Sequence, residues 1–149
     1  NADYKNSNIL FEFSNITYYE KTSPLILNQN LVKTIFKTNF NIVLLDINDT
    51  EFNINLETYN IEKYLERKII YIKLYGPNNL YQGTYTDDKL NEIKDKLSYD
   101  KEIHYIFANV ETNKDNKLFI EKKNEDCTKN DYPSSIWNAT YLIARYAMD

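Results

Sequence analysis

Four strand-length apolar runs, separated by segments with helical periodicity, constrain the fold of this chain more than any other feature. The runs lie at residues 9–13, 42–46, 69–75 and 103–108. Most of them are apolar on both faces, which is typical of strands in a parallel sheet that helices cover. We therefore expect an α/β fold with parallel strands, built from about four strand–helix units in the order βαβ(α)βαβα.

Capping residues predict where the helices begin. Ser23 can cap a helix that has Pro24 at its first position and reaches about Phe36. Thr86 can cap a second helix, because Asp87 and the next residue place acidic groups in its first turn. The same reasoning predicts helices at residues 86–97, at 134–148 and, more briefly, around 61–65.

Both glycines of the chain, Gly76 and Gly83, lie between the third strand and the second helix, in the segment KIIYIKLYGPNNLYQG at 68–83. A strand that runs through a Gly-Pro turn and a tyrosine-rich loop into a helix has the order that builds sites in α/β proteins. We expect an unusual backbone conformation in this loop.

Composition sets limits on the class of protein. The 149 residues fit one domain, and the net charge of −4 argues against broad binding to nucleic acid or to an anionic membrane. A single Cys127 excludes an internal disulfide framework and suits a reducing compartment, where its simplest interpretation is an ordinary thiol. The chain contains neither an apolar run of about 18 residues nor an export signal. We expect a soluble, cytoplasmic or otherwise intracellular protein.

Residues 111–131 break the strand–helix rhythm with a charged, asparagine-rich segment. This length exceeds that of an ordinary connection between a strand and a helix. The segment is interpreted as a mobile insertion or solvated hairpin, with a lid or a partner-binding loop as the alternative. Because the chain begins with Asn1 rather than Met, we also expect a processed product or a piece of something longer.

Several motifs follow one another in a recognisable order. They are EFSNITY at 12–18, LLD at 44–46, YIKLYG at 71–76, YQGTYT at 81–86 with Leu90, YIFAN at 105–109, and Asn138-Ala139. In this order they resemble the C-terminal half of the YecE-like family, the domain of unknown function 72, whose strongest signature is Y-[VI]-R-L-H-G followed by Y-x-G-x-Y-[ST]-x-x-x-L. The resemblance covers roughly residues 8 to 145.

The family fold is an eight-stranded TIM-type barrel, so the resemblance implies that this chain supplies strands five to eight. Half a barrel leaves two strand edges to be paired. The resemblance therefore implies a complementary half barrel in the rest of the polypeptide or in a second chain, or a homo-oligomer.

The chain departs from the family pattern at its polar positions. Ser14-Asn15 stand where the family has Arg-His, Lys73 and Tyr75 stand for the Arg and His of R-L-H-G, and Tyr18 replaces a Trp. Lysine does not reproduce the bidentate fork of arginine, and no histidine remains there for acid–base work or metal binding. The family site is therefore expected to be degenerate here.

Barrel geometry brings the C-terminal strand ends together at one rim. The candidate catalytic residues there are Glu12, Asp46 and Lys73, and the candidate ligand-binding residues are Tyr75, Tyr81, Gly83, Tyr85 and Asn109.

Each candidate also has a structural interpretation. Glu12 can form a salt bridge with Lys73, Asp46 can cap a loop, Gly83 can serve a turn, and Asn109 can satisfy backbone groups at a strand end.

No cofactor is expected. One histidine and one cysteine exclude a zinc site built from several such ligands, so a divalent cation on Glu12 and Asp46 is the only metal alternative. His104, between apolar neighbours, is interpreted as a core or interface histidine.

Two hypotheses of function follow. The first is a non-catalytic scaffold or interaction subunit. The alternative is a hydrolase-like barrel enzyme that handles phosphate or nucleic acid, with its site at the C-terminal rim. The degenerate polar positions and the missing half barrel favour the scaffold.

Overall fold

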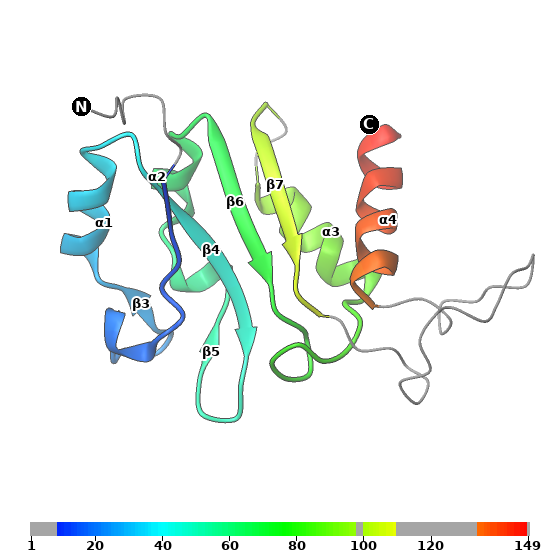
Figure 1. The fold of residues 1–149 in the computed structure, drawn as a ribbon, viewed down its shortest axis with the longest axis horizontal. Helices are drawn as coiled ribbons and strands as arrows, with labels where there is room; N and C mark the ends of the chain where they lie inside the picture. Colours follow the sequence, from blue (N-terminus) through cyan, green and yellow to red (C-terminus); the bar gives the residue numbers. More distant parts are fainter. Residues whose placement is uncertain (1–8, 98–99, 110–133, 149) are drawn as a thin grey trace, which may run out of the picture.

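A computed structural model describes residues 9–97, 100–109 and 134–148 as an α/β fold around a parallel sheet (Figure 1). Its strand order is β1-β4-β6-β7, and every neighbouring pair in that path is parallel. The strands are β1 (Leu10–Phe11), β4 (Asn41–Asn48), β6 (Ile69–Leu74) and β7 (Glu102–Phe107). The expected α/β fold with parallel strands is thus confirmed, and the described strands form an open sheet with β1 and β7 at its edges.

Shorter strands complete the described part of the chain. Strand β5 (Asn53–Ile54) returns antiparallel along the end of β4, and β2 (Tyr19–Glu20) pairs with β3 (Ile26–Leu27) in a separate antiparallel ribbon. The helices are α1 (Gln29–Phe36), α2 (Ile61–Leu65), α3 (Asp87–Lys96) and α4 (Ser134–Ala147), with short 3-10 turns η2 (Ile16–Tyr18) and η3 (Leu56–Thr58). Helices α2 and α3 lie behind the strands in Figure 1, and α4 lies beyond β7. None of the described helices has the length and apolarity needed to cross a membrane.

Strand register divides the sheet into two faces. On β6, Leu74 is fully buried and aligns with Asp46 of β4, while Lys73 aligns with Leu45. Because side chains alternate along a strand, Leu74 and Asp46 project from one face and Lys73 from the other. We call these the α3 face and the Lys73 face, since the first carries the buried core under α3.

Helix α3 follows its sequence signals. The Thr86 hydroxyl accepts a hydrogen bond from the Lys89 amide at 3.2 Å, and Asp87 lies in the first turn as predicted. Leu90 and Ile93 are buried against the sheet, as is Leu97 just beyond the helix. The predictions for α2 and α4 are also confirmed, with α4 running from Ser134 to Ala147.

The predicted start of the first helix is wrong. Helix α1 begins at Gln29, where the Asn28 side chain accepts hydrogen bonds from Asn30 N at 3.1 Å and Leu31 N at 3.0 Å. Residues 26–27 pair with β2 instead of extending the helix, and Pro24 lies ahead of them in a turn. Asparagine is as good an N-cap residue as serine, so Ser23 and Asn28 were equally plausible starts for the helix.

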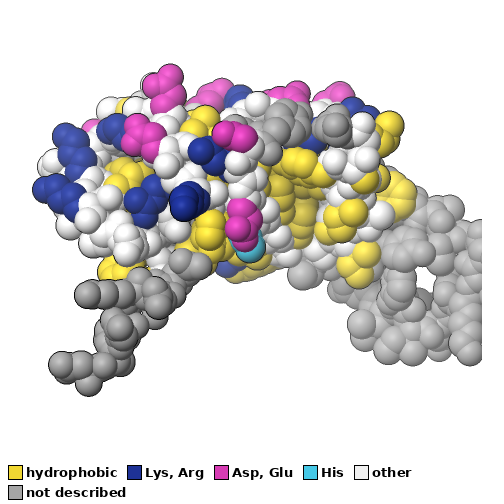
Figure 2. All heavy atoms as spheres, turned by 90° about the horizontal axis from the view of Figure 1, so that it is seen from above, with side chains coloured by type: hydrophobic (Ala, Val, Ile, Leu, Met, Phe, Trp, Pro, Cys, Tyr) yellow, Lys and Arg dark blue, Asp and Glu magenta, His cyan; other side chains and the backbone are white. Residues whose placement is uncertain are grey.

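Strand β7 is only partly buried, unlike the predicted buried strand. Glu102, His104 and Ile106 are exposed, Ile106 by 40%. His104 bonds to Glu102 at 2.7 Å and stacks on Tyr71 with ring centroids 4.8 Å apart. Figure 2 shows the histidine at the surface beside acidic side chains. Of the predicted core or interface histidine, the core interpretation is therefore wrong, and the interface interpretation stays a prediction.

The loop after β6 has the unusual backbone that its glycines predict. Gly76 and Gly83 have φ of 135° and 83°, and Tyr81 also has a positive φ of 64°. A Cβ at Gly76 would lie 2.4 Å from the Gln82 carbonyl oxygen, so only glycine fits there. The charged segment at 111–131 and Cys127 lie outside the described residues.

Candidate functional site

The residues expected at one rim divide into three clusters, two of which share Tyr85. Asp46 lies on the α3 face, whereas Lys73 and its partner Glu12 lie on the Lys73 face. Asn109 belongs to a third group, beside α4. The expectation of a single constellation is therefore wrong: the strand ends meet at one edge, but the alternation of side chains separates Asp46 from Lys73.

The first cluster joins the segment just after β1, strand β6 and the loop that follows β6. Lys73 Nζ lies 3.0 Å from Glu12 Oε2 and 3.2 Å from Oε1, and the Tyr75 hydroxyl donates a hydrogen bond to Oε1. The same ammonium lies 4.6 Å from the centroid of the Tyr75 ring. Tyr81, half exposed, packs its ring 5.5 Å from that of Tyr75. The predicted contact between Glu12 and Lys73 is present.

The groups of this cluster hold one another in their ordinary protonation states. Burial alone would lower the pKa of Lys73, but its hydrogen bonds with Tyr75 and Glu12 raise that pKa above the usual value. Burial, followed by the hydrogen bond to Glu12, raises the pKa of Tyr75. At neutral pH the lysine is thus charged and the tyrosine neutral, so neither is poised as a base or nucleophile.

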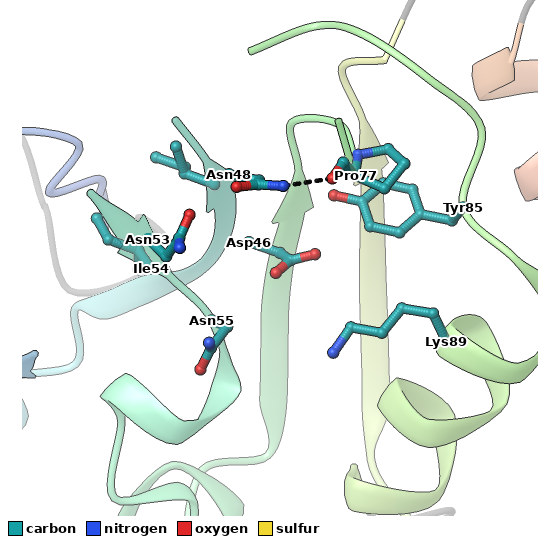
Figure 3. A pocket seen from close by; sticks show the side chains of 9 residues that line it. Asp46, Asn48, Asn53, Ile54, Asn55, Pro77, Tyr85 and Lys89 are labelled. Atoms are coloured by element: carbon teal, nitrogen blue, oxygen red, sulfur yellow. Dashed lines mark hydrogen bonds between the residues drawn. The ribbon is translucent and has the colours of Figure 1, made fainter. Parts of the chain in front are cut away.

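The second cluster surrounds Asp46 at the C-terminal end of β4. The Tyr85 hydroxyl accepts a hydrogen bond from the Gly76 amide at 3.0 Å, and it lies close enough to the Asp46 carboxylate to lower the pKa of that group. Lys89, in the first turn of α3, contributes a positive charge nearby. Figure 3 shows Asp46, Tyr85 and Lys89 directed toward the same space, with Asn53 and the rest of the β4–β5 turn on its opposite side.

Burial dominates the electrostatics of this second cluster. It raises the pKa of Asp46, against the hydrogen bond from Tyr85 and the charge of Lys89, which lower it. Burial, and then the negative charge of Asp46, raises the pKa of Tyr85 well above its usual value. Tyr85 therefore remains protonated at neutral pH.

The third cluster fastens the loop before α3 to α4. Asn138 accepts a hydrogen bond from the Tyr85 amide at 3.1 Å and donates one to the Tyr85 carbonyl at 3.0 Å, as a neighbouring strand would. Asn109 donates to the Asn138 side-chain oxygen at 2.8 Å and to the Gly83 carbonyl at 3.0 Å. Both asparagines are fully buried. The observed contacts of Asn109 and Gly83 are structural ones.

Comparison with known proteins does not assign this chain to a family. No protein-family model, no curated protein and no solved structure matches it. The likeness to the YecE-like family thus rests on the sequence motifs alone.

The described residues hold no group of three or more histidine, cysteine, aspartate or glutamate side chains arranged for a metal ion. Glu12 and Asp46, the pair considered for a divalent cation, project from opposite faces of the sheet. They do not converge on one ion.

Sequence reasoning missed most of the residues around Asp46. Asn48, Asn53, Asn55 and Lys89 line the space beside it, together with Ile47, Ile54, Pro77 and Tyr85. A signal was present, because Asn48 lies two residues after Asp46 and so shares its face. Lys89 lies three residues after the cap Thr86, which places it in the first turn of α3.

Proposed function

We propose that this chain is a degenerate half of a YecE-like barrel that acts as a structural or interaction subunit. The observation that carries the proposal is the open parallel sheet, in which β7 pairs only with β6 among the described strands. TIM-type barrels close with eight strands, and a half sheet needs a partner for its edges. The partner would be a complementary half barrel, in the same polypeptide or another, or a second copy of this chain.

The polar groups on the Lys73 face support a structural role. The Glu12 carboxylate bonds to both Lys73 and Tyr75, so two of the three predicted catalytic residues, Glu12 and Lys73, are paired with each other. Ile106, which aligns with Lys73 on β7, is exposed by 40% at the sheet edge. A partner strand beside β7 would cover this side chain.

The mass of the species in solution tests the proposal. We expect native mass spectrometry of the natural-source protein to find either a polypeptide of about 250 residues, the size of a closed barrel, or this chain in a dimer or larger complex. The variant Ile106→Lys should weaken an intermolecular assembly, whereas Ile143→Lys, the same change on α4, should not. A monomeric species of the chain alone at all concentrations would contradict the proposal.

A second candidate function is the handling of phosphate or nucleic acid on the Lys73 face. It is favoured by one observation: the Lys73 side chain, at the C-terminal end of β6, remains 24% exposed beside Tyr75 and Tyr81. An incoming phosphate would have to compete with Glu12 for that ammonium. Saturable binding of inorganic phosphate that is lost in Lys73→Met would favour this candidate over the scaffold.

A further inference from the structure

A polar pocket on the α3 face lies apart from the Lys73 face. It has a volume of about 330 Å³, is open to solvent and is lined by the end of β4, the β4–β5 turn, the loop after β6 and the first turn of α3. Small-molecule sites have volumes from roughly 300 Å³ upward, so the pocket accepts a compact ligand. All of its walls come from one chain, and its formation does not depend on the proposed assembly.

The floor of the pocket is held rigidly. Tyr85 is fixed at its hydroxyl by the Gly76 amide and at its backbone by Asn138. Its hydroxyl lies near the Asp46 carboxylate and lowers the pKa of that group. On the other side, the Asn48 side chain donates a hydrogen bond to the Pro77 carbonyl and joins the β4–β5 turn to the loop after β6 (Figure 3). Polar groups held in this way bind a ligand without first being ordered.

Much of the hydrogen-bonding capacity of the walls is unused. The Asp46 carboxylate has several acceptor positions, and the Tyr85 hydroxyl is the one uncharged donor of the described residues that influences its pKa. The Asn55 side-chain oxygen accepts from the Glu57 amide, which leaves its NH₂ group as a donor. The side-chain amide of Asn53 is exposed on the rim. A ligand thus meets both donors and acceptors.

The charges in the pocket favour a ligand with no net charge. Asp46 would repel an anion and Lys89 would repel a cation, and the Lys89 ammonium pairs with Glu92 at 3.2 Å rather than with Asp46. The partly exposed Pro77 adds apolar surface between the polar groups. Hydroxyl groups both donate and accept hydrogen bonds, so they match a wall that alternates carboxylate, amide and ammonium.

The geometry points to a binding site for a small neutral polyhydroxy compound, of the size of a monosaccharide, with Asp46 as the acceptor for its hydroxyl groups. Asn53, Asn55 and Lys89 supply the donors. The site is distinct from the Glu12–Lys73–Tyr75 cluster, which lies on the other face of the sheet.

Titration by ¹H–¹⁵N NMR tests this site. The probes are glucose, galactose, ribose and glycerol, with inorganic phosphate and methylammonium as charged comparisons. We expect at least one polyol to shift the amides of residues 46–55 and 85–89 saturably, and to do so at lower concentration than either ion. Asp46→Asn should weaken that binding about tenfold, because a hydrogen bond to a charged acceptor is lost.

Asp49→Asn is the matched control, since Asp49 lies in the same turn but does not line the pocket. It should leave the binding unchanged. If the spectrum of Asp46→Asn shows an unfolded protein, Asn53→Ala at the exposed rim replaces it and should also weaken binding. Absence of saturable shifts with every polyol, tighter binding of either ion, or full binding in Asp46→Asn or its replacement would overturn the proposal.

Discussion

The Tyr59 hydroxyl accepts a hydrogen bond from the backbone amide of Leu45 at 3.0 Å, at a point on β4 beyond its pairing with β1. Because Tyr19 donates to the Phe13 carbonyl at 2.6 Å, its oxygen is available to accept from Tyr59, 3.3 Å away. The result is a directed chain from Leu45 through two phenols to Phe13. Beyond the end of the short strand β1, these side chains take over the hydrogen bonding that a neighbouring strand would provide to β4.

Replacing Tyr59 tests this continuation. Tyr59→Phe leaves the buried Leu45 amide without its acceptor, and an unsatisfied buried group costs about 1–3 kcal/mol. We expect the free energy of unfolding to fall by that amount in urea denaturation. Tyr18→Phe is the control, since Tyr18 is largely exposed and should change stability little. Equal stability of both variants would mean that water or a rearranged backbone replaces the phenol.

The same tyrosines predict a loss of stability at high pH. Burial raises the pKa of Tyr19 to about 12 and that of Tyr59 well above its usual value. Since the unfolded chain releases these protons near pH 10, the folded state binds more protons above that pH. Their contribution is complete below about pH 10 and is lost as the pH rises toward 12. Equilibrium unfolding at several pH values should show this decline, and Tyr19→Phe should make it shallower.

How far the sequence could predict the fold is illustrated by β6 and α1. The run at 69–75 was predictable as a strand because apolar residues and a following Gly-Pro turn leave few alternatives. The start of α1 was not, because Ser23 and Asn28 offer equal caps and the choice depends on the pairing of β2 with β3, which is a tertiary effect. Exposure of β7 likewise depends on its place at the edge of the sheet.

The sequence predicted which side chains lie at the strand ends, but not the face of the sheet from which each one projects. That Glu12 meets Lys73 followed from their charges and from strand ends that share one rim. That Asp46 turns away from both follows from register, in which Leu45, not Asp46, aligns with Lys73. A shift of one residue reverses the face of every side chain, and an apolar run such as Val43-Leu44-Leu45 does not specify its register.

The Glu12–Lys73 pair should contribute little to stability. Both side chains are partly exposed, by 33% and 24%, so solvent screens the pair and a contribution of about 0–1 kcal/mol is expected. A double-mutant cycle with Glu12→Gln and Lys73→Met measures the coupling, and added salt should reduce it. A coupling energy of several kcal/mol would show that the Glu12–Lys73 pair is more shielded from solvent than its partial exposure indicates. The pair Lys96–Glu92 on α3, which is more exposed, serves as the comparison.

Removing the charge of Asp46 should stabilise the protein at neutral pH. Burial raises the pKa of Asp46, so the folded state disfavours ionisation, and its stability falls as the pH rises above the unfolded value near 3.8. Asp46→Asn removes this penalty and keeps the shape of the side chain. The stability of Asp46→Asn relative to the unchanged protein should therefore increase from acid to neutral pH. A difference that is independent of pH would show that the carboxyl group ionises normally.

Asn138 is the residue whose loss should damage the fold most. Asn138→Leu keeps the approximate volume but leaves the amide and carbonyl of Tyr85 unpaired, and removes an acceptor from Asn109. Each buried polar group left without a hydrogen bond costs about 1–3 kcal/mol. We therefore expect the free energy of unfolding to fall by at least about 2 kcal/mol. Asn30→Leu, on the exposed side of α1, is the matched control and should be nearly neutral. Hydrogen exchange should localise the effect, because freeing the Tyr85 amide removes its protection before the core of β4 and β6 opens.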